Sequence, residues 1–410
     1  MTTELRPPAA AEWDAWFGCT ERAFGGVGSA PERRELFAAL TDPARTLGHR
    51  DGEDWVGTAG AYRFRVTVPG GAAVPAAGVT MVSVAATHRR RGLLTSMMRR
   101  QLADVHAWGE PLAVLTASEP AIYGRFGYGA AAREMRLRID TARVRLDVPP
   151  GTDAVRVRYA SPAAALAACE DVYARLAPGR PGTPVRQPGW DRLALLDPEQ
   201  TREGASPLQC VLAERDGRVT GYATYRVRPD WDGAGPRGSV LLRDLAALDP
   251  ASCAALWRFL LGIDLVSVVE CRNRPADDAV LHMVSDVRRC EVHLRDGLYV
   301  RLVDVGAALE ARSYRAPVDV VLDVEDAFCP WNAGRWRLTA DEKGVASCRR
   351  TEDPADLALS VRELGTAYLG GVPLSGLAAA GRIREKREGA VAEASSAFFT
   401  EVEPWCPHEF

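Results

Sequence analysis

One stretch of the chain restricts the possible folds more than any other. Between residues 78 and 117, an apolar strand-like run, a basic turn with a glycine, a helical segment and a second apolar run follow one another. The helical segment, residues 93–108, carries its apolar residues on one stripe. Two strands joined through a helix of this length run parallel in one sheet, whereas an antiparallel pair needs only a tight turn. The sequence therefore predicts a βαβ unit here.

The rest of the chain divides into three blocks. In the first block, residues 1–147, we expect a helix at 10–24 and strands at 55–64, 78–85, 112–117 and 133–139 around the helix 93–108. The run Val148-Pro149-Pro150-Gly151 is typical of a linker. The second block, residues 148–295, repeats this order, with helices at 163–176 and 250–261 and strands at 208–214, 219–226, 240–246 and 265–270. We interpret it as a diverged internal duplicate of the first block.

The third block, residues 296–410, has a different pattern. We expect strands at 299–303, 318–324 and 357–361, a hairpin around 336–338 and 345–349, and helices at 362–369 and 373–380. The last six residues form an aromatic, acidic tail, W-C-P-H-E-F. Such a tail is unlike solvating low-complexity sequence, so we expect it to pack against the protein.

Composition and charge exclude several classes of function. The chain has 51 basic and 54 acidic residues, a net charge of −3, so no basic field favours nucleic acid or an anionic membrane. Nine cysteines stand singly without C-x-x-C, and six histidines show no zinc-binding spacing, so we expect reduced thiols and no metal. No signal peptide and no apolar run long enough to span a bilayer is visible. These features predict a cytoplasmic enzyme or binding protein.

The basic turn of the βαβ unit is the strongest sign of chemistry. It reads T-H-R-R-R-G-L-L at residues 87–94, between an apolar strand and the start of the helix. The first backbone N–H groups of a helix lack partners inside the helix and lie at the positive end of its dipole, so they bind phosphate. Gly92 would allow close approach of a phosphate, and the arginines would add charge. The alternative is a solvated basic loop before a surface helix.

Two long motifs at matching spacing connect this turn to a known family. The turn 87–94 and the run L-T-A-S-E-x-x-I-Y-G-R-F-G-Y-G at 115–129 resemble the Eis-type (enhanced intracellular survival) N-acetyltransferases of the GNAT superfamily. The general GNAT pattern at the turn is Gln/Arg-x-x-Gly-x-Gly/Ala, and Leu94 departs from its last position. The resemblance also covers the three-block layout and the terminal Glu409-Phe410, so it spans essentially the whole chain.

The resemblance implies a mixed α+β fold: a catalytic GNAT domain at 1–147, a degenerate GNAT-like domain at 148–295 and a domain like sterol carrier protein at 296–410. It implies acetyl-coenzyme A as co-substrate and no metal. Its cofactor contacts fall on Val82, Ser83, Val84, Arg89, Arg90, Arg91, Gly92, Leu93, Leu94, Thr95, Ser118 and Glu119. The equivalent turn of the second block, residues 245–252, has no glycine and no arginine cluster, and its Asp249 would repel a diphosphate. We therefore expect only the first domain to bind the cofactor.

The resemblance also implies the catalytic groups. Tyr123 would be the general acid that protonates the departing thiolate, since a phenol of pKa about 10 can protonate a thiolate whose parent thiol has a pKa near 8.5. The carboxylate of the last residue, Phe410, would be the general base; a free α-carboxyl has a pKa of about 3.5, which desolvation would raise. Tyr128 is a competing candidate for the acid. We assign neither His88 nor His408 as the base.

The nature of the acceptor stays open at this point. The family acetylates amines, including aminoglycosides and lysine side chains, and here Glu409 and Met81 fall at substrate-cleft positions. Met81 replaces an aromatic residue, and glycines at 25, 26 and 28 followed by Arg33-Arg34 replace an acidic residue and a tryptophan, which weakens the case for aminoglycosides. The resemblance further implies a homohexamer. Two other readings are a non-catalytic acyl-coenzyme A sensor and a carrier of hydrophobic ligands that uses the third domain.

Overall fold

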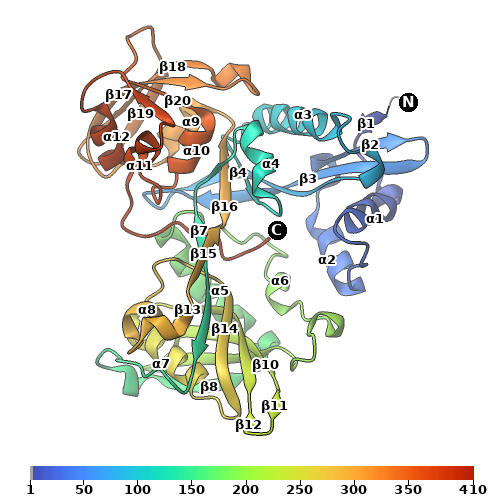
Figure 1. The fold of residues 1–410 in the computed structure, drawn as a ribbon, viewed down its shortest axis with the longest axis vertical. Coiled ribbons are helices and arrows are strands. Elements are labelled where there is room, and N and C mark those ends of the chain that lie inside the picture. The colour runs from blue at the N-terminus through green and yellow to red at the C-terminus, as the bar shows by residue number, and fades with distance from the viewer. Residues whose placement is uncertain (1–2) are drawn as a thin grey trace. The chain divides into compact units, whose positions relative to one another are not determined.

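The computed structural model describes residues 3–410, and the chain forms two compact units (Figure 1). The first unit contains the chain up to Ala132, the short segment Arg180–Val185 and the part Asp296–Phe410. The second unit contains Arg133–Gly179 and Arg186–Arg295. Because the chain leaves the first unit and returns to it twice, residues far apart in sequence build that unit together.

The first unit is organised around a mixed seven-stranded sheet in the order β1-β2-β3-β4-β5-β16-β6. Its strands are β1 (Glu4–Arg6), β2 (Thr46–Asp51), β3 (Asp54–Thr67), β4 (Ala73–Val84), β5 (Leu112–Thr116), β16 (Leu298–Leu302) and β6 (Gly129–Ala130). β4 and β5 pair in parallel and α3 (Leu93–Ala107) connects them, so the predicted βαβ unit is confirmed. α3 packs through a fully buried face that contains Met97, Met98, Leu102 and Val105, which is the stripe that its sequence predicts.

The N-terminal part of this unit contains further helices. They are α1 (Trp13–Ala23), α2 (Pro31–Leu40) and α4 (Pro120–Tyr123). α1 buries Trp16 and Phe17 in an aromatic cluster with Trp55 of β3. α2 and β2 have no counterpart in the sequence prediction, because α2 buries only Leu36 and β2 carries polar residues among its buried ones.

Two strands lie in other sheets than the order of the sequence predicts. The strand at 133–139, expected in the first block, is β7 (Arg133–Asp140) and pairs with β14 (Val266–Arg274) in the second unit. The strand expected at 299–303 in the third block is β16, and it pairs with β5 in the first sheet, where Figure 1 draws it in orange beside cyan strands. Both strands are present as predicted, but each lies in another sheet than its block implied, because an apolar pattern marks a buried strand and does not identify its partner.

The second unit contains its own seven-stranded sheet in the order β15-β7-β14-β13-β10-β9-β8. Its other strands and main helices are β8 (Arg156–Ala160), β9 (Gln209–Arg215), β10 (Arg218–Arg228), β13 (Gly238–Ala247), β15 (His293–Asp296), α5 (Pro162–Leu176), α6 (Arg192–Leu195), α7 (Pro250–Leu261) and α8 (Val280–Met283). β11 (Trp231–Asp232) and β12 (Gly235–Pro236) form a separate small ladder. Asp216 and Gly217 both have positive φ between β9 and β10, as the predicted hairpin requires.

The C-terminal part of the first unit adds a five-stranded sheet in the order β19-β18-β17-β20-β21. Its elements are α9 (Val305–Ala311), β17 (Val318–Glu325), β18 (Gly334–Ala340), β19 (Ala346–Arg350), β20 (Leu357–Ser360), α10 (Val361–Ala367), α11 (Leu374–Ala379), β21 (Ile383–Glu385) and α12 (Ala390–Phe398). The predicted hairpin, strands and two helices are present, whereas α9 and α12 were not predicted. From residue 399 to Phe410 the chain has no helix or strand.

Two further features concern the cysteines and the length of the apolar helices. The nine cysteines, all within the described residues, are free thiols, and eight of them are buried while Cys253 is half-buried. Within residues 3–410, no helix is both long and apolar enough to cross a bilayer.

Candidate active site

β4 and β5 pair over only three positions. Ala76, Ala77 and Gly78 of β4 face Leu112–Val114 of β5, and the rest of β4, up to Val84, has no pairing with β5. A left-handed Met81 (φ 51°) and a register shift against β3 accompany this separation. In the described chain, the edge of β4 at Val82–Val84 that faces away from β3 is therefore free to pair with an extended ligand.

The side chain of Ser83 does not point to that free edge. It is buried, and its hydroxyl oxygen lies 2.7 Å from that of Thr58, which in turn lies 2.9 Å from the hydroxyl of Thr20. Thr58 also donates to the carbonyl of Met81 at 2.7 Å. This hydroxyl chain was missed at the sequence level, and it fixes the irregular segment of β4. Only the backbone of Ser83 is left for a ligand.

The basic turn opens directly onto the start of α3. Gly92 is the N-cap of α3 with φ +80°, no side chain caps the helix, and a Cβ at Gly92 would meet nothing within 4 Å. The first backbone hydrogen bond of the helix runs from Ser96 N–H to the carbonyl of Gly92 at 3.0 Å. The N–H groups of residues 93–95 precede it and have no partner inside the helix. With the exposed side chains of Arg89–Arg91, these groups are the kind that could hold an anion.

Two histidines hold this turn in place. The Nε2 atom of His88 lies 3.0 Å from a carboxylate oxygen of Asp51, and its Nδ1 lies 2.8 Å from the hydroxyl of Thr87. The Nε2 atom of the buried His49 lies 2.6 Å from the hydroxyl of Ser96. Burial lowers the pKa of His49. His88 therefore anchors the turn to Asp51 of β2, and the role of His49 could not be predicted from the sequence.

Tyr123 ends the short helix α4 that follows β5. Exposed Ser118 and Glu119 lie between β5 and this helix, and Glu119 is its N-cap. Burial, with a smaller contribution from the negative charge of Glu119, raises the pKa of Tyr123 to about 12. The ring of Tyr128 contacts that of Tyr123 edge-on, with 5.9 Å between ring centroids. Tyr128 is fully buried, and within residues 3–410 its hydroxyl has no hydrogen-bond partner.

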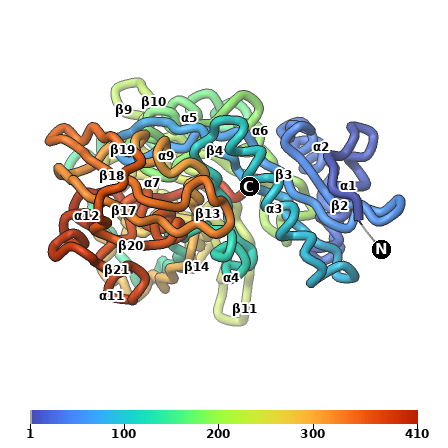
Figure 2. The backbone as a smooth tube through the Cα atoms, turned by 90° about the horizontal axis from the view of Figure 1, so that it is seen from above, coloured from blue at the N-terminus to red at the C-terminus, as the bar shows by residue number. Residues whose placement is uncertain are grey.

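The C-terminal tail packs onto the first sheet, and both views in Figures 1 and 2 place the chain end there. The N–H of Trp405 donates to the carbonyl of Pro181 at 2.9 Å, and Arg180 donates to the carbonyl of Glu403 at 2.6 Å. These contacts place the last residues of the chain along the segment Arg180–Val185, which itself pairs with β3.

The last residue reaches the end of β5. The hydroxyl of Thr116 donates to a C-terminal oxygen of Phe410 at 3.5 Å, and the ring of Phe410 packs edge-on against Phe64 with 4.8 Å between centroids. Thr116 is the last residue of β5, and α4 with Tyr123 begins four residues later at Pro120. Phe410 therefore lies at the end of β5, and the helix that ends with Tyr123 follows that end of the strand in the chain.

The remaining candidate residues lie around this end of the sheet or on the tail. Met81 packs against the aromatic cluster of Trp16, Phe17 and Trp55. Glu409 is exposed, and the carbonyl of His408 accepts a hydrogen bond from the thiol of Cys406 at 3.3 Å. His408 thus belongs to the local fold of the tail.

Comparisons with known proteins identify the family of this fold. Residues 4–131 and 182–302 each match an acetyltransferase (GNAT) domain, and residues 305–407 match a sterol carrier protein domain. The N-acetyltransferase Eis of Mycobacterium tuberculosis is 35% identical over 426 aligned residues that cover 100% of both chains. The chain belongs to the Eis-type GNAT N-acetyltransferases. It is an acyltransferase, and its fold is the one that the sequence predicts.

Two further relatives span the whole chain. An uncharacterized N-acetyltransferase of Streptomyces avermitilis is 66% identical over 410 residues, 100% of both chains. The crystal structure of Eis1 from Mycobacterium abscessus is similar with a TM-score of 0.82 and 34% identity, again over 100% of both chains. The Eis-type fold thus extends from the first strand to the tail.

The second GNAT domain has a closed counterpart of the basic turn. Asp249 is the N-cap of α7, and its carboxylate accepts from the N–H of Ser252 at 2.9 Å and from its hydroxyl at 2.8 Å. Gly92 leaves the start of α3 open, whereas Asp249 occupies the start of α7 with its own negative charge. This supports the interpretation that the second domain of this Eis-type chain does not bind coenzyme A.

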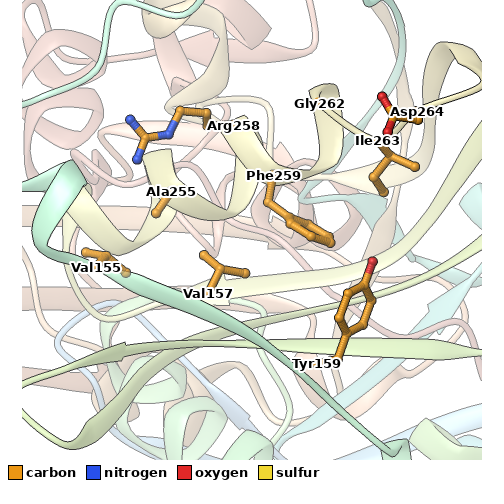
Figure 3. Close-up of a pocket in the computed structure, with 9 residues that line it drawn as sticks. All are labelled: Val155, Val157, Tyr159, Ala255, Arg258, Phe259, Gly262, Ile263 and Asp264. Carbon is orange, nitrogen blue, oxygen red and sulfur yellow. The ribbon is translucent and has the colours of Figure 1, made fainter.

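The second unit does contain a groove of about 620 Å³ beside the edge strand β8 (Figure 3). Val157 and Tyr159 of β8 face Phe259 of α7 across it, with Arg258 and Asp264 as its charged residues. This groove has neither a glycine turn nor an open helix start, so we assign the candidate active site to the first unit instead. Within residues 3–410, no cluster of three or more His, Cys, Asp or Glu side chains could hold a metal ion.

Proposed function

We propose that the protein transfers an acetyl group from acetyl-coenzyme A to a primary amine, with Tyr123 as general acid and the Phe410 carboxylate as general base. The observation that carries the proposal is the position of the chain end. A C-terminal oxygen of Phe410 lies 3.5 Å from the hydroxyl of Thr116, at the end of the strand that leads to the helix of Tyr123.

The acetyl donor would lie along the open edge of β4. Backbone groups of Val82–Val84 would pair with the amides of its pantetheine arm, and the N–H groups at the start of α3 with Arg90 would hold its diphosphate. The open space above Gly92 and the free edge of β4 fit such a ligand. When bound, the donor supplies the activated thioester.

The transfer forms one C–N bond and breaks one C–S bond. The amine nitrogen attacks the thioester carbonyl carbon, and coenzyme A leaves as a thiolate. The Phe410 carboxylate accepts the proton that the nitrogen loses, and the Tyr123 phenol donates its proton to the thiolate sulfur. Both groups then regain their starting protonation states by exchange with solvent.

The raised pKa of Tyr123 does not argue against this role. By itself, a phenol of pKa about 12 is a weaker acid than a free tyrosine. Desolvation raises the pKa of a thiolate in the same surroundings too, because it disfavours every uncompensated negative charge. Burial thus raises the pKa of both the Tyr123 phenol and the coenzyme A thiol. The phenol is therefore a less unfavourable proton donor to the thiolate than its own pKa alone indicates.

The combined variant Arg90→Glu, Gly92→Val is expected to lower the affinity for acetyl-coenzyme A by at least about 100-fold, because it inverts a charge and fills the approach to the backbone. Calorimetry with acetyl-coenzyme A measures this. The matched control is Gly109→Val, since Gly109 also has a positive φ (+71°) with open space around it but lies at the other end of α3. Unchanged affinity in the double variant would refute the cofactor site.

The acceptor class is tested by measuring released thiol with polyamines, aminoglycosides and lysine-containing peptides. We propose an amine acceptor, so turnover with at least one of these classes is expected. Tight binding of acetyl-coenzyme A without any turnover would instead favour a sensor.

We also propose that the chain assembles as a homohexamer, as the family resemblance implies. Light scattering of the purified protein is expected to give six times the mass of one chain. A monodisperse species with the mass of a single chain would contradict this proposal.

A further inference from the structure

The turn that follows Tyr123 is rich in glycine, and its glycines face elements of the C-terminal part of the first unit. A Cβ at Gly124 would lie 2.8 Å from the guanidinium carbon of Arg362, and one at Gly129 would collide with the backbone of α10. Gly127 has φ +85°, and a Cβ there would lie 2.7 Å from Nε of Arg301. The glycines of this motif therefore allow the C-terminal part to approach the turn closely.

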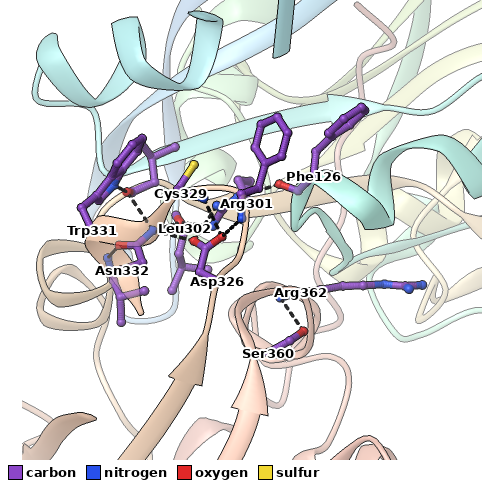
Figure 4. A network of polar contacts seen from close by, with 12 residues as sticks. Phe126, Arg301, Leu302, Asp326, Cys329, Trp331, Asn332, Ser360 and Arg362 are labelled. Carbon is purple, nitrogen blue, oxygen red and sulfur yellow. Dashed lines mark hydrogen bonds and ion pairs between the residues drawn. The ribbon is translucent and has the colours of Figure 1, made fainter. Parts of the chain in front are cut away.

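Arg301 makes the central contact with this turn (Figure 4). Its side chain is 0% exposed, and its Nε donates to the carbonyl of Phe126 at 2.9 Å. Its two other nitrogens donate to the carbonyl of Leu302 at 2.7 Å and to a carboxylate oxygen of Asp326 at 2.6 Å. All three nitrogens of the planar guanidinium are thus used, each on a different acceptor.

Asp326, the partner of Arg301, is itself held firmly. Its side chain is 1% exposed. One carboxylate oxygen accepts from the N–H of Cys329 at 2.9 Å, and the other also accepts from the side-chain amide of Asn332 at 3.1 Å. A buried ion pair with these additional hydrogen bonds has one well-defined geometry.

The turn is short enough to transmit this constraint to Tyr123. Gly127 N–H donates to the carbonyl of Gly124 at 3.1 Å, and Tyr128 N–H donates to the carbonyl of Tyr123 at 3.3 Å. Phe126, whose carbonyl Arg301 holds, also packs its ring against Phe328, with 5.0 Å between centroids. Arg301 thus holds Phe126, which lies three residues after Tyr123 in a turn that two backbone hydrogen bonds close.

We propose that Arg301, fixed by Asp326, is a positioning residue that holds the turn after Tyr123 and thereby orients the phenol. The inference rests on the proposed role of Tyr123 as the acid. It gives the sterol carrier protein-like domain a part in catalysis beyond carrying the C-terminus, since Asp326, Phe328 and α10 support the turn from that domain.

The test is Arg301→Lys, which keeps a positive charge opposite Asp326 but has a single nitrogen in place of the planar fork, so it cannot reach three acceptors that are bound by three different guanidinium nitrogens. We expect kcat to fall roughly 10–100-fold, as for a catalytic group displaced by about 1 Å, with KM for acetyl-coenzyme A within about twofold of wild type. In a Tyr123→Phe background, the same substitution should cause no further loss. An additive loss in that background would overturn the inference.

Arg45→Lys is the matched control. Arg45 also forms a buried ion pair, with Glu110 at 2.6 Å, and its Nε donates to the carbonyl of Ala61 at 3.0 Å, but no contact joins it to the turn. Both variants should lower the melting temperature to a similar extent, and only Arg301→Lys should lower kcat. Equal losses of kcat in both variants would mean that Arg301 is merely structural.

A second readout is independent of acetyl transfer. With 3-fluorotyrosine at position 123, Arg301→Lys is expected to broaden or shift the fluorine resonance, and Arg45→Lys is expected to leave it unchanged. If Arg301→Lys changes the fluorine resonance but the protein has no transferase activity, the proposed function is refuted, while the link between Arg301 and the turn after Tyr123 stands. An unresponsive resonance with unchanged kcat would refute the inference alone.

If Arg301→Lys does not fold, Gly127→Ala keeps both residues of the ion pair but forces the turn and the guanidinium of Arg301 apart, since its Cβ would lie 2.7 Å from Nε of Arg301. Gly109→Ala introduces the same kind of backbone strain without any neighbour within 4 Å. Lower kcat and a shifted fluorine resonance for Gly127→Ala but not for Gly109→Ala support the inference, and the same behaviour in both variants refutes it.

Discussion

A short peptide tag added after Phe410 is expected to lower the acetyl-transfer rate by roughly 10²–10⁴-fold, the range of a lost general base. The tag converts the terminal carboxylate into a neutral peptide carbonyl, which cannot accept the proton of the amine. The new carboxylate is also displaced from the end of β5, where Thr116 contacts Phe410. Melting temperature and affinity for acetyl-coenzyme A should stay close to those of the untagged protein.

The controls separate the charge of the chain end from its packing. A tag before residue 1 should be tolerated. A C-terminal amide made by peptide ligation keeps the ring of Phe410 against Phe64 and removes only the charge, so it should be as inactive as the tagged form. Phe410→Ala keeps the carboxylate and loses the ring contact, so its loss should be smaller. Equal turnover of N- and C-terminally tagged proteins would exclude the carboxylate as the base.

Most elements of this fold are visible in the sequence because their local patterns are strong. The apolar stripe of α3 and the Asp216-Gly217 hairpin each determine a local structure, and both are present. The partners of β7 and β16 could not be predicted in this way, because strand pairing depends on contacts between distant parts of the chain. A five-residue strand that is buried throughout, as β16 is, fits the centre of either sheet equally well.

The same limit applies to the site. Gly92 could be predicted because a positive φ at an uncapped helix start is a local property of a glycine turn. Arg301 could not, since it contacts Phe126 across 175 positions of sequence, and 49 of the 51 basic residues are arginines that look alike in the sequence. What distinguishes Arg301 is its complete burial with three satisfied nitrogens, which only the folded chain reveals.

Tyr123→Phe is expected to lower kcat by roughly 10²–10⁴-fold while leaving the affinity for acetyl-coenzyme A unchanged, because the ring stays and only the proton donor is lost. Stopped-flow measurement of thiol release with any accepted amine, together with calorimetry, tests both parts. The acid must be protonated to act, so it is lost only as pH rises through its pKa. Since that pKa is raised to about 12, ionisation of Tyr123 should cause no loss of wild-type activity below about pH 10.

Tyr128→Phe is the matched control, because the ring of Tyr128 is in contact with that of Tyr123 and the substitution also removes only a hydroxyl. The hydroxyl of Tyr128 is fully buried and, within residues 3–410, has no hydrogen-bond partner. Removing such a group costs no hydrogen bond and relieves its desolvation, so Tyr128→Phe should keep full activity and be at least as stable as wild type. An inactive Tyr128→Phe beside an active Tyr123→Phe would assign the acid to Tyr128, and its buried hydroxyl would then need to reach the thiolate by a movement of the glycine turn.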